Sequence, residues 1–273
     1  MTVPVEFNLA GRQIPAHLVF ETLAYIVGFQ TYLLLRRREA RGANSSIGAQ
    51  VHLWLVVGAV FGALFGSKLL AIVESFPEYW AARADPRVWL EGKTIVGGLL
   101  GGWVGVEIVK KICRVHTSTG DAYVLPLILG IAIGRIGCFL TGLSDHTHGK
   151  TTALPWGVDF GDGIARHPTQ LYEIAALLVI GAIVYARSRR PHFRGELFRQ
   201  FVFLYLLFRF AVEFIKPTYK PYLGLSAIQV ACGIGVIVAL ISLVQRRRST
   251  LSTPAPVRPD LDLKQHPAAQ RPA

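Results

Sequence analysis

Long apolar runs, each of about 20 residues, constrain this chain more than any other feature of its sequence. The runs lie at 17–35, 51–73, 94–112, 122–141, 168–186, 198–215 and 225–244. Because lipid offers no hydrogen bonds to a backbone, a span of this length must be helical, and the runs lack the alternation of membrane β-strands. Only 17% of the residues are charged, against about 25% in soluble domains. We predict an all-α polytopic membrane protein with seven transmembrane helices.

Basic residues between the runs predict which way the helices cross the membrane. The segments after the first, third, fifth and seventh runs, taken together with the ends of the runs that border them, hold 18 arginines and lysines, and the segments on the other side hold 8. Since positive charge is retained in the cytoplasm, we expect the amino terminus outside and the carboxyl terminus inside. Arg36, Arg37 and Arg38 follow the first run, so we do not expect a cleaved signal peptide. The net charge of +12 then reflects topology, and no nucleic-acid partner is expected.

Composition divides the chain into two parts. We predict a seven-helix membrane domain over residues 1–248 and a disordered cytoplasmic tail, rich in Pro, Ala and Gln, over 249–273. The second and third runs carry glycines four residues apart, which let helix backbones approach closely. These glycines are Gly58, Gly62, Gly66, Gly97, Gly101 and Gly105. We interpret them as packing positions, although Gly97 and Gly98 also line the site that we predict below.

Apart from the basic residues at the cytoplasmic ends of the runs, already counted above, three basic residues lie inside the apolar runs: Lys68, Arg135 and Arg209. Each sits five or six positions before the outer end of its span, about 8 to 9 Å below the outer boundary at 1.5 Å per residue. Three acids lie at a similar level: Glu21, Glu173 and Glu213. Polar groups therefore gather on the outer side and do not line a path across the membrane. This distribution disfavours a channel or transporter, whose site should lie near the midplane.

An anion fits such a cluster of cations. Arginine presents a fork of N–H donors that grips phosphate with two hydrogen bonds, and a phospholipid phosphate lies at this depth. We expect Arg135 and Arg209 to bind a phospholipid head group, because intramembrane charges are usually functional. The alternative is that Arg209 and Glu213, one helical turn apart, form a buried structural pair. For Lys68 we favour the structural interpretation, in which its ammonium group extends outward to the interface.

Two motifs flank the loop between the fourth and fifth runs. Gly134-Arg135-Ile136-Gly137-Cys138-Phe139-Leu140-Thr141-Gly142 ends the fourth run, with glycines that leave space beside the arginine. Arg166-His167-Pro168-Thr169-Gln170-Leu171-Tyr172-Glu173 begins the fifth, where proline suits the first helical position. Gln170 and Glu173 are three residues apart and should share one helix face.

At these motifs the chain resembles the prolipoprotein diacylglyceryl transferase family. The resemblance rests on GRIGCFLTG at 134–142, RHPTQLYE at 166–173, RFAVEF at 209–214, AYIVGF at 24–29 and VGGLLGG at 96–102. It implies a seven-helix bacterial inner-membrane protein whose active site faces the periplasm or the cell exterior. It also implies transfer of the diacylglyceryl group of phosphatidylglycerol to the thiol of a lipobox cysteine in a preprolipoprotein. Glycerol phosphate leaves and a thioether forms.

The resemblance also implies roles for individual residues. By position, Arg135 and Arg209 match the family's essential arginines, Glu213 matches its following acid, and His167, Gln170 and Glu173 match its HPxQLYE box. We expect the catalytic residues to be Arg135, Arg209, His167 and Glu213. We expect the arginines to bind substrate together with Gly97, Gly98, Gln170, Tyr172, Glu173, Glu21 and Lys68. The expected partners are phosphatidylglycerol, the lipobox segment and membrane lipid.

Several positions depart from the family pattern. Val96 stands where typical members have a histidine, Cys138 where they have an asparagine, and Glu21 near an expected tyrosine. A thiol with a pKa near 8.5 needs a base or a positive field to react, so the remaining base candidates are His167, Glu21 and Glu213. We rank His167 first, and capping of the fifth helix is its alternative role. These departures motivate two alternatives: a catalytically silent paralogue that binds phospholipid or lipoprotein, and a transferase with a different acceptor.

Neither the cysteines nor the histidines indicate a metal site in the sequence alone. Cys113, Cys138 and Cys232 share no metal or redox spacing, and a cysteine in an apolar helix is usually a packing residue. The loop Asp145-His146-Thr147-His148 could join His167 around a metal, but two histidines and one acid are a weak signal. We expect an exposed polar loop there, with no metal and no cofactor.

Overall fold

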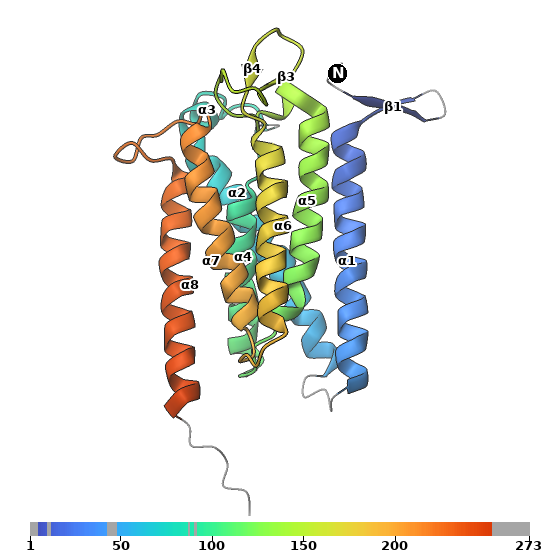
Figure 1. Cartoon of the computed structure of the whole chain (residues 1–273), viewed down its shortest axis with the longest axis vertical. Coiled ribbons are helices and arrows are strands. Elements are labelled where there is room, and N and C mark those ends of the chain that lie inside the picture. Colours follow the sequence, from blue (N-terminus) through green and yellow to red (C-terminus); the bar gives the residue numbers. More distant parts are fainter. Residues whose placement is uncertain (1–4, 10–11, 43–47, 87, 90–91, 253–273) are drawn as a thin grey trace, which may run out of the picture.

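The structure is a computed structural model that describes residues 5–9, 12–42, 48–86, 88–89 and 92–252. Long helices run roughly side by side along one axis (Figure 1). They are α1 (Ala16–Gly42), α2 (Ala49–Glu74), α4 (Ile95–Ile112), α5 (Val124–Thr141), α6 (Thr169–Ser188), α7 (Glu196–Val212) and α8 (Ala227–Ser252). The first four residues of the predicted tail, 249–252, continue helix α8, and residues 253–273 lie outside the described residues.

Five of the described helical segments are long and apolar enough to cross a membrane. They are Ala16–Arg37, Ala49–Glu74, Gly120–Asp145, Thr169–Ser188 and Ala227–Arg247. The third long helix of the bundle, α4, carries Glu107, Lys110 and Lys111 near its end, and α7 has 17 residues. These two helices correspond to the third and sixth predicted spans, so the count of seven spans stays a prediction. The membrane character of the chain itself is clear from the five apolar helices.

The prediction of a helical membrane protein is confirmed in its main part, and short strands that were not predicted lie at one end of the bundle. Strands β1 (Glu6–Leu9) and β2 (Arg12–Pro15) pair antiparallel, as do the two-residue strands β3 (Val158–Asp159) and β4 (Ala165–Arg166). These strands lie outside the apolar runs, and they are too short to leave an alternating pattern in the sequence. Figure 1 shows β1, β3 and β4 at the same end of the bundle as the short helix α3 (Phe76–Ala81).

Apolar side chains occupy both the interior and the outside of the helices. Phe201, Tyr205 and Leu206 of α7 are fully buried and form a core with residues of α4, α5, α6 and α8. On the outside, Phe61 and Phe65 of α2 are 69% and 71% exposed. A soluble protein would bury such side chains, whereas lipid accepts them.

Glycines bring α2 and α4 into direct backbone contact, as the spacing predicted. A Cβ atom added at Gly62 would lie 2.3 Å from the carbonyl oxygen of Gly101, and one at Gly66 would lie 2.4 Å from that of Gly97. Any side chain at these positions would therefore push the helices apart. This contact fixes α4, which begins at Ile95 after the N-cap Thr94.

We expect Gly62→Ala to destabilise the protein by about 1 to 3 kcal/mol, because the added methyl group overpacks a helix contact. Thermal unfolding of the purified protein in detergent measures the effect. Gly233→Ala in α8 is the matched control, since nothing lies within 4 Å of a Cβ at that position. Equal melting temperatures for the two variants would contradict the close α2–α4 contact.

Candidate functional site

Two arginines from different helices meet on one carboxylate oxygen. Arg135 Nε of α5 lies 2.8 Å from Glu173 Oε2 of α6, and Arg209 Nη1 of α7 lies 3.2 Å from the same oxygen. The Nε–H of Arg135 is not directed at this oxygen, so that contact is an ion pair and not a hydrogen bond. Arg135 is 6% exposed and Arg209 is 4% exposed. The structure thus brings together the two arginines that the sequence singled out.

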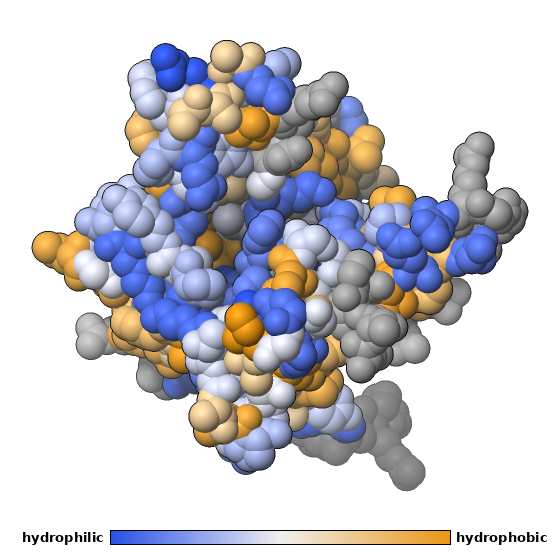
Figure 2. All heavy atoms as spheres, turned by 90° about the horizontal axis from the view of Figure 1, so that it is seen from above, coloured by the Kyte–Doolittle hydropathy of each residue, from blue (hydrophilic) through white to orange (hydrophobic). Residues whose placement is uncertain are grey.

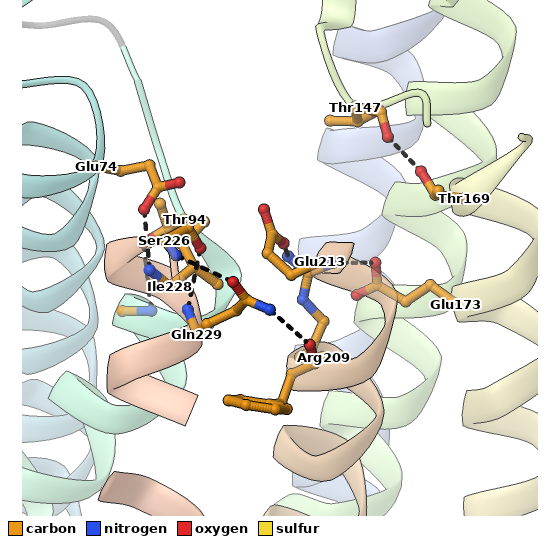
Figure 3. Close-up of polar contacts among 12 residues, drawn as sticks. Glu74, Thr94, Thr147, Thr169, Glu173, Arg209, Glu213, Ser226, Ile228 and Gln229 are labelled. Carbon is orange, nitrogen blue, oxygen red and sulfur yellow. Dashed lines mark hydrogen bonds and ion pairs between the residues drawn. The ribbon is translucent and has the colours of Figure 1, made fainter. Parts of the chain in front are cut away.

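Two further groups of the α7 segment complete this ionic cluster. Arg209 Nη2 donates a hydrogen bond of 3.3 Å to Glu213 Oε2, which is the contact that the alternative, structural interpretation predicted. The hydroxyl of Tyr205 donates a hydrogen bond of 2.6 Å to Glu173 Oε1. In Figure 3, Arg209 lies between Glu173 and Glu213. We call Arg135, Glu173, Tyr205, Arg209 and Glu213 the arginine cluster.

Sequence reasoning missed Tyr205, although a signal was present. Tyr205, Arg209 and Glu213 follow one another at intervals of four residues, which places them on one helix face. A tyrosine in an apolar run is usually read as an ordinary core or interface residue. Here its ring is buried and its hydroxyl is directed at a carboxylate.

The arginine cluster is electrically balanced but leaves hydrogen-bonding capacity unused. Its two arginines face two glutamates, which compensates the cost of burying charge. Among the described side chains, Arg209 Nε and Glu213 Oε1 are buried without a hydrogen-bond partner. Each such atom costs about 1 to 3 kcal/mol unless something bonds to it. A ligand oxygen can accept a hydrogen bond from Arg209 Nε, and a ligand hydroxyl can donate one to Glu213 Oε1, so the arrangement suits a group that carries both an anionic oxygen and a hydroxyl.

A third cation, which sequence reasoning also missed, lies next to the arginine cluster. Lys216 follows the short helix η3 (Glu213–Ile215) and is only 8% exposed. It interacts electrostatically with Arg209 and Arg135 and with the two glutamates of the cluster. Burial, together with repulsion by the arginines, lowers the pKa of Lys216 to about 8. Its charge therefore changes within the physiological range of pH.

Gln170 and Glu173, which we predicted on one helix face, contact different groups. Glu173 joins the arginine cluster, whereas Gln170 Nε2 donates a hydrogen bond of 3.0 Å to Thr147 Oγ1. Thr169 also donates to the carbonyl oxygen of Thr147 (Figure 3). These bonds fasten the loop after the short helix η2 (Gly142–Asp145) to the start of α6. The Oε1 atom of Gln170 is buried and unpartnered, so Gln170 retains one acceptor for a ligand.

His167 and Tyr172 form a separate contact beside α6. His167 Nδ1 lies 3.2 Å from the Tyr172 hydroxyl, which also accepts a hydrogen bond of 2.8 Å from Trp156 Nε1. The alternative role of His167 as a side-chain cap is not seen, because α6 begins at Thr169 without a side-chain cap. The sequence predicts Pro168 at the first position of this helix, but in the structure Pro168 is the N-cap and the helix begins one residue later.

Glu21 and Lys68 make contacts outside the arginine cluster. Glu21 pairs with Lys93 at 2.9 Å and accepts a hydrogen bond of 3.2 Å from Tyr25. The ammonium group of Lys68 lies over the ring of Tyr79, 5.3 Å from its centroid. Tyr79 belongs to α3, at the end of the bundle, so Lys68 extends toward that end as its structural interpretation predicted.

The third predicted span brings no polar side chain to the site from positions 96–98. Val96 is 1% exposed and packs in the apolar core, and Gly97 packs against Gly66 of α2. Gly98 faces Ala63 and Ser67 of the same helix at ordinary contact distance. Both glycines therefore face α2. Their role in lining a site stays a prediction.

Figure 2 looks down on the end of the bundle that carries the short strands. Hydrophilic residues surround a hollow between the helices there, while apolar residues lie around the outside. A further pocket lies at α1, α2 and the α4–α5 connection, with residues such as Tyr32, His52 and Asp121 in its lining. That pocket contains no member of the arginine cluster.

The chain matches the family model described as prolipoprotein diacylglyceryl transferase over residues 11–245. A relative from Bordetella parapertussis is 32% identical over 227 residues, which cover 80% of this chain and 85% of the relative. One from Nitratidesulfovibrio vulgaris (strain Miyazaki F) is 35% identical over 250 residues, covering 85% and 91%. One from Cupriavidus metallidurans is 32% identical over 222 residues, covering 77% and 80%. All three are named phosphatidylglycerol–prolipoprotein diacylglyceryl transferase.

Proposed function

Because the chain belongs to the prolipoprotein diacylglyceryl transferase family, we propose that it transfers the diacylglyceryl group of phosphatidylglycerol to a prolipoprotein. The acceptor is the thiol of the lipobox cysteine. The observation that carries the proposal is the meeting of Arg135 and Arg209 on Glu173, close beneath one end of the bundle. A buried pair of guanidinium groups with unused donors is suited to a phosphodiester.

The transfer forms one bond and breaks another at a glyceryl carbon. The acceptor sulfur attacks this carbon, and the bond from the carbon to a phosphate oxygen breaks. Negative charge then grows on the phosphate, which leaves as glycerol phosphate. Arg135 and Arg209 stabilise that charge most strongly in the transition state, because they are held in place before the reaction begins. Glu173 and Tyr205 orient the two arginines through the contacts described above.

The acceptor thiol must lose its proton for this attack. Val96 cannot act as the base, because a valine side chain has no ionisable group. His167 is the first candidate to accept the proton, with Tyr172 holding its ring, and Glu213 is the second, since its Oε1 atom has no hydrogen-bond partner. Glu21, the third candidate, is occupied by Lys93 and Tyr25.

We place the reaction at the outer face of the bacterial inner membrane. The support is the charge asymmetry of the loops, with 18 basic residues on one side and 8 on the other. With α4 and α7 as spans, the bundle crosses the membrane seven times, and the arginine cluster then lies near the periplasmic surface. Phosphatidylglycerol reaches it from the outer leaflet, and the secreted lipobox segment reaches it from the periplasm.

One assay tests the proposed function directly. The purified protein is mixed with phosphatidylglycerol and a lipobox peptide, and the peptide is weighed by mass spectrometry. We expect the peptide to gain one diacylglyceryl group, and a peptide with serine in place of the cysteine to gain none. Binding of lipid and peptide without a gain in mass would contradict the proposal and indicate a silent binding protein.

We expect the Michaelis constant for phosphatidylglycerol to rise several-fold as pH rises through about 8, because Lys216 then loses its positive charge. Arginine stays charged at every accessible pH, so Lys216→Arg should flatten this dependence. Steady-state kinetics across this pH range provide the measurement, with Lys220→Arg as control. The acceptor thiol also titrates here, but that change should persist in both variants. An unchanged pH profile in Lys216→Arg would exclude a role for this charge.

A further inference from the structure

A second group of polar side chains lies at the junction of α1 and α5. His17 is near the start of α1, Cys138 lies in the last turn of α5, and Asp145 ends η2. One ligand atom from each residue lies within 4.8 Å of the other two. We propose that these three residues bind a zinc ion, and that the zinc holds the acceptor cysteine as a thiolate. The second half of this inference rests on the proposed function.

The donor set and its spacing suit zinc. His17 Nδ1 lies 3.2 Å from Asp145 Oδ1, yet no hydrogen bond satisfies this buried nitrogen among the described residues. Nitrogen and oxygen ligands at about 2.0 to 2.2 Å from a tetrahedral zinc lie roughly 3.3 to 3.6 Å apart. The two atoms are therefore close to the separation that a shared metal requires. Thiolate, imidazole and carboxylate together favour zinc over magnesium or calcium.

Neighbouring side chains hold two of these ligands in place. The other ring nitrogen of His17, Nε2, lies 3.5 Å from Glu21 Oε2. The second oxygen of Asp145, Oδ2, accepts a hydrogen bond from Thr147, which is itself bonded by Gln170. Metal-binding histidines almost always donate their other ring N–H to a carboxylate, a backbone carbonyl or a water, which fixes the ring orientation. Ring nitrogen Nδ1 and oxygen Oδ1 are thus left facing one another.

Three protein ligands leave one coordination position for another molecule. Structural zinc sites have four protein ligands, whereas sites that bind or activate a ligand keep the fourth position open. The side chain of His17 is 41% exposed and that of Asp145 is 10% exposed, so the cluster is accessible from one side. Cys138 is buried and forms the closed side. An incoming cysteine can therefore reach the metal past His17.

Zinc would supply the activation that Val96 does not provide. A thiol that binds zinc releases its proton to solvent, since the metal stabilises the thiolate. The thiolate then attacks the glyceryl carbon, the carbon–sulfur bond forms, and the bond to the phosphate oxygen breaks. Glycerol phosphate leaves with the electron pair of that bond. Arg135 Nη1 lies 3.7 Å from Cys138 Sγ, so the nucleophile and the phosphate would be held by adjacent side chains.

Metal content and cobalt absorption test the site on the full-length protein in detergent. We expect about one zinc ion per chain, and a thiolate-to-cobalt absorption band after exchange for cobalt. Cys138→Ser should abolish this band, and Asp145→Asn should reduce the bound metal. Cys113→Ser, at the C-cap of α4, is the matched control and should change neither. Glu21→Gln should weaken zinc affinity about 10- to 100-fold through the orientation of His17.

The same preparations separate this inference from the proposed function. Metal far below one ion per chain, or a cobalt band that survives Cys138→Ser, would overturn the zinc site. Full transfer activity after removal of zinc would overturn its role in catalysis and leave the transferase function intact. Zinc bound through these residues in a protein that transfers nothing would support the site and contradict the proposed function.

Discussion

Replacing Arg209 by lysine is expected to lower kcat/KM for diacylglyceryl transfer about 100- to 1,000-fold. A lysine keeps the positive charge but loses the planar fork of donors, so it cannot contact Glu173, Glu213 and a phosphate at once. In the structure Arg209 uses Nη1 for Glu173 and Nη2 for Glu213, and its Nε has no hydrogen-bond partner. Steady-state kinetics with phosphatidylglycerol and a lipobox peptide measure the loss.

Arg187→Lys is the matched control for this variant. Arg187 is also ion-paired, with Glu196 at 2.8 Å, but it lies outside the arginine cluster. We expect its kcat/KM to remain within about threefold of the unchanged protein, as for a pair remote from the reaction. If Arg209→Lys retained activity comparable to this control, bidentate phosphate binding by Arg209 would be wrong.

The largest loss of stability is expected for Glu173→Gln. Glu173 compensates both arginines and accepts the hydrogen bond of Tyr205, so its neutralisation leaves two buried cations beside one remaining acid. Breaking a buried ion pair in this way costs about 3 to 5 kcal/mol. Chemical or thermal unfolding in detergent measures the change. A variant that melts like the unchanged protein would show that the arginines do not depend on Glu173.

The exposed Glu78 of α3 provides the control for that experiment. Its side chain lies at the surface, where substitutions usually change stability by about 0.5 kcal/mol or less. Glu78→Gln makes the same chemical change as Glu173→Gln, because each replaces a carboxylate by an amide of similar size. A large difference between the two variants therefore reports burial and pairing, and not the loss of a negative charge as such.

The helices could be predicted from the sequence because the thickness of the bilayer requires each spanning helix to have about 20 apolar residues. Each predicted run overlaps a helix of the structure, including the run at 94–112 with α4 and the run at 198–215 with α7. The strand pairs could not be predicted in the same way. Strands β3 and β4 have two residues each, and their pairing depends on loop contacts such as the bridge between Thr151 and Arg166.

The arginine cluster could be predicted in part. Burial cost and helix depth identified Arg135 and Arg209, and the spacing of Arg209 and Glu213 suggested their pairing as the alternative to a binding role. Both arginines contact Glu173 because of the way in which α5, α6 and α7 pack together. The spacing of residues along the sequence does not predict this packing. The contact of Cys138 with Arg135 is local, whereas the approach of His17 to Asp145 joins residues that are distant along the chain.

Two separate predictions were made for Gly97. The spacing of the glycines predicted close helix packing, and this is confirmed, because a Cβ atom at Gly97 would lie 2.3 Å from the carbonyl oxygen of Gly66. The motif predicted that Gly97 also lines a site, and that stays a prediction. A small residue can be required by a neighbouring helix or by a ligand, and the sequence does not distinguish these causes.

The central claim is that Arg135 and Arg209 together hold the phosphate of a phospholipid. Native mass spectrometry can test it by comparing retention of phosphatidylglycerol with retention of diacylglycerol, which has the same chains but no phosphate. We expect the unchanged protein and Arg187→Gln to retain phosphatidylglycerol in preference. We expect the double variant of Arg135→Gln and Arg209→Gln to lose that preference. A double variant that still selects phosphatidylglycerol over diacylglycerol would contradict the claim.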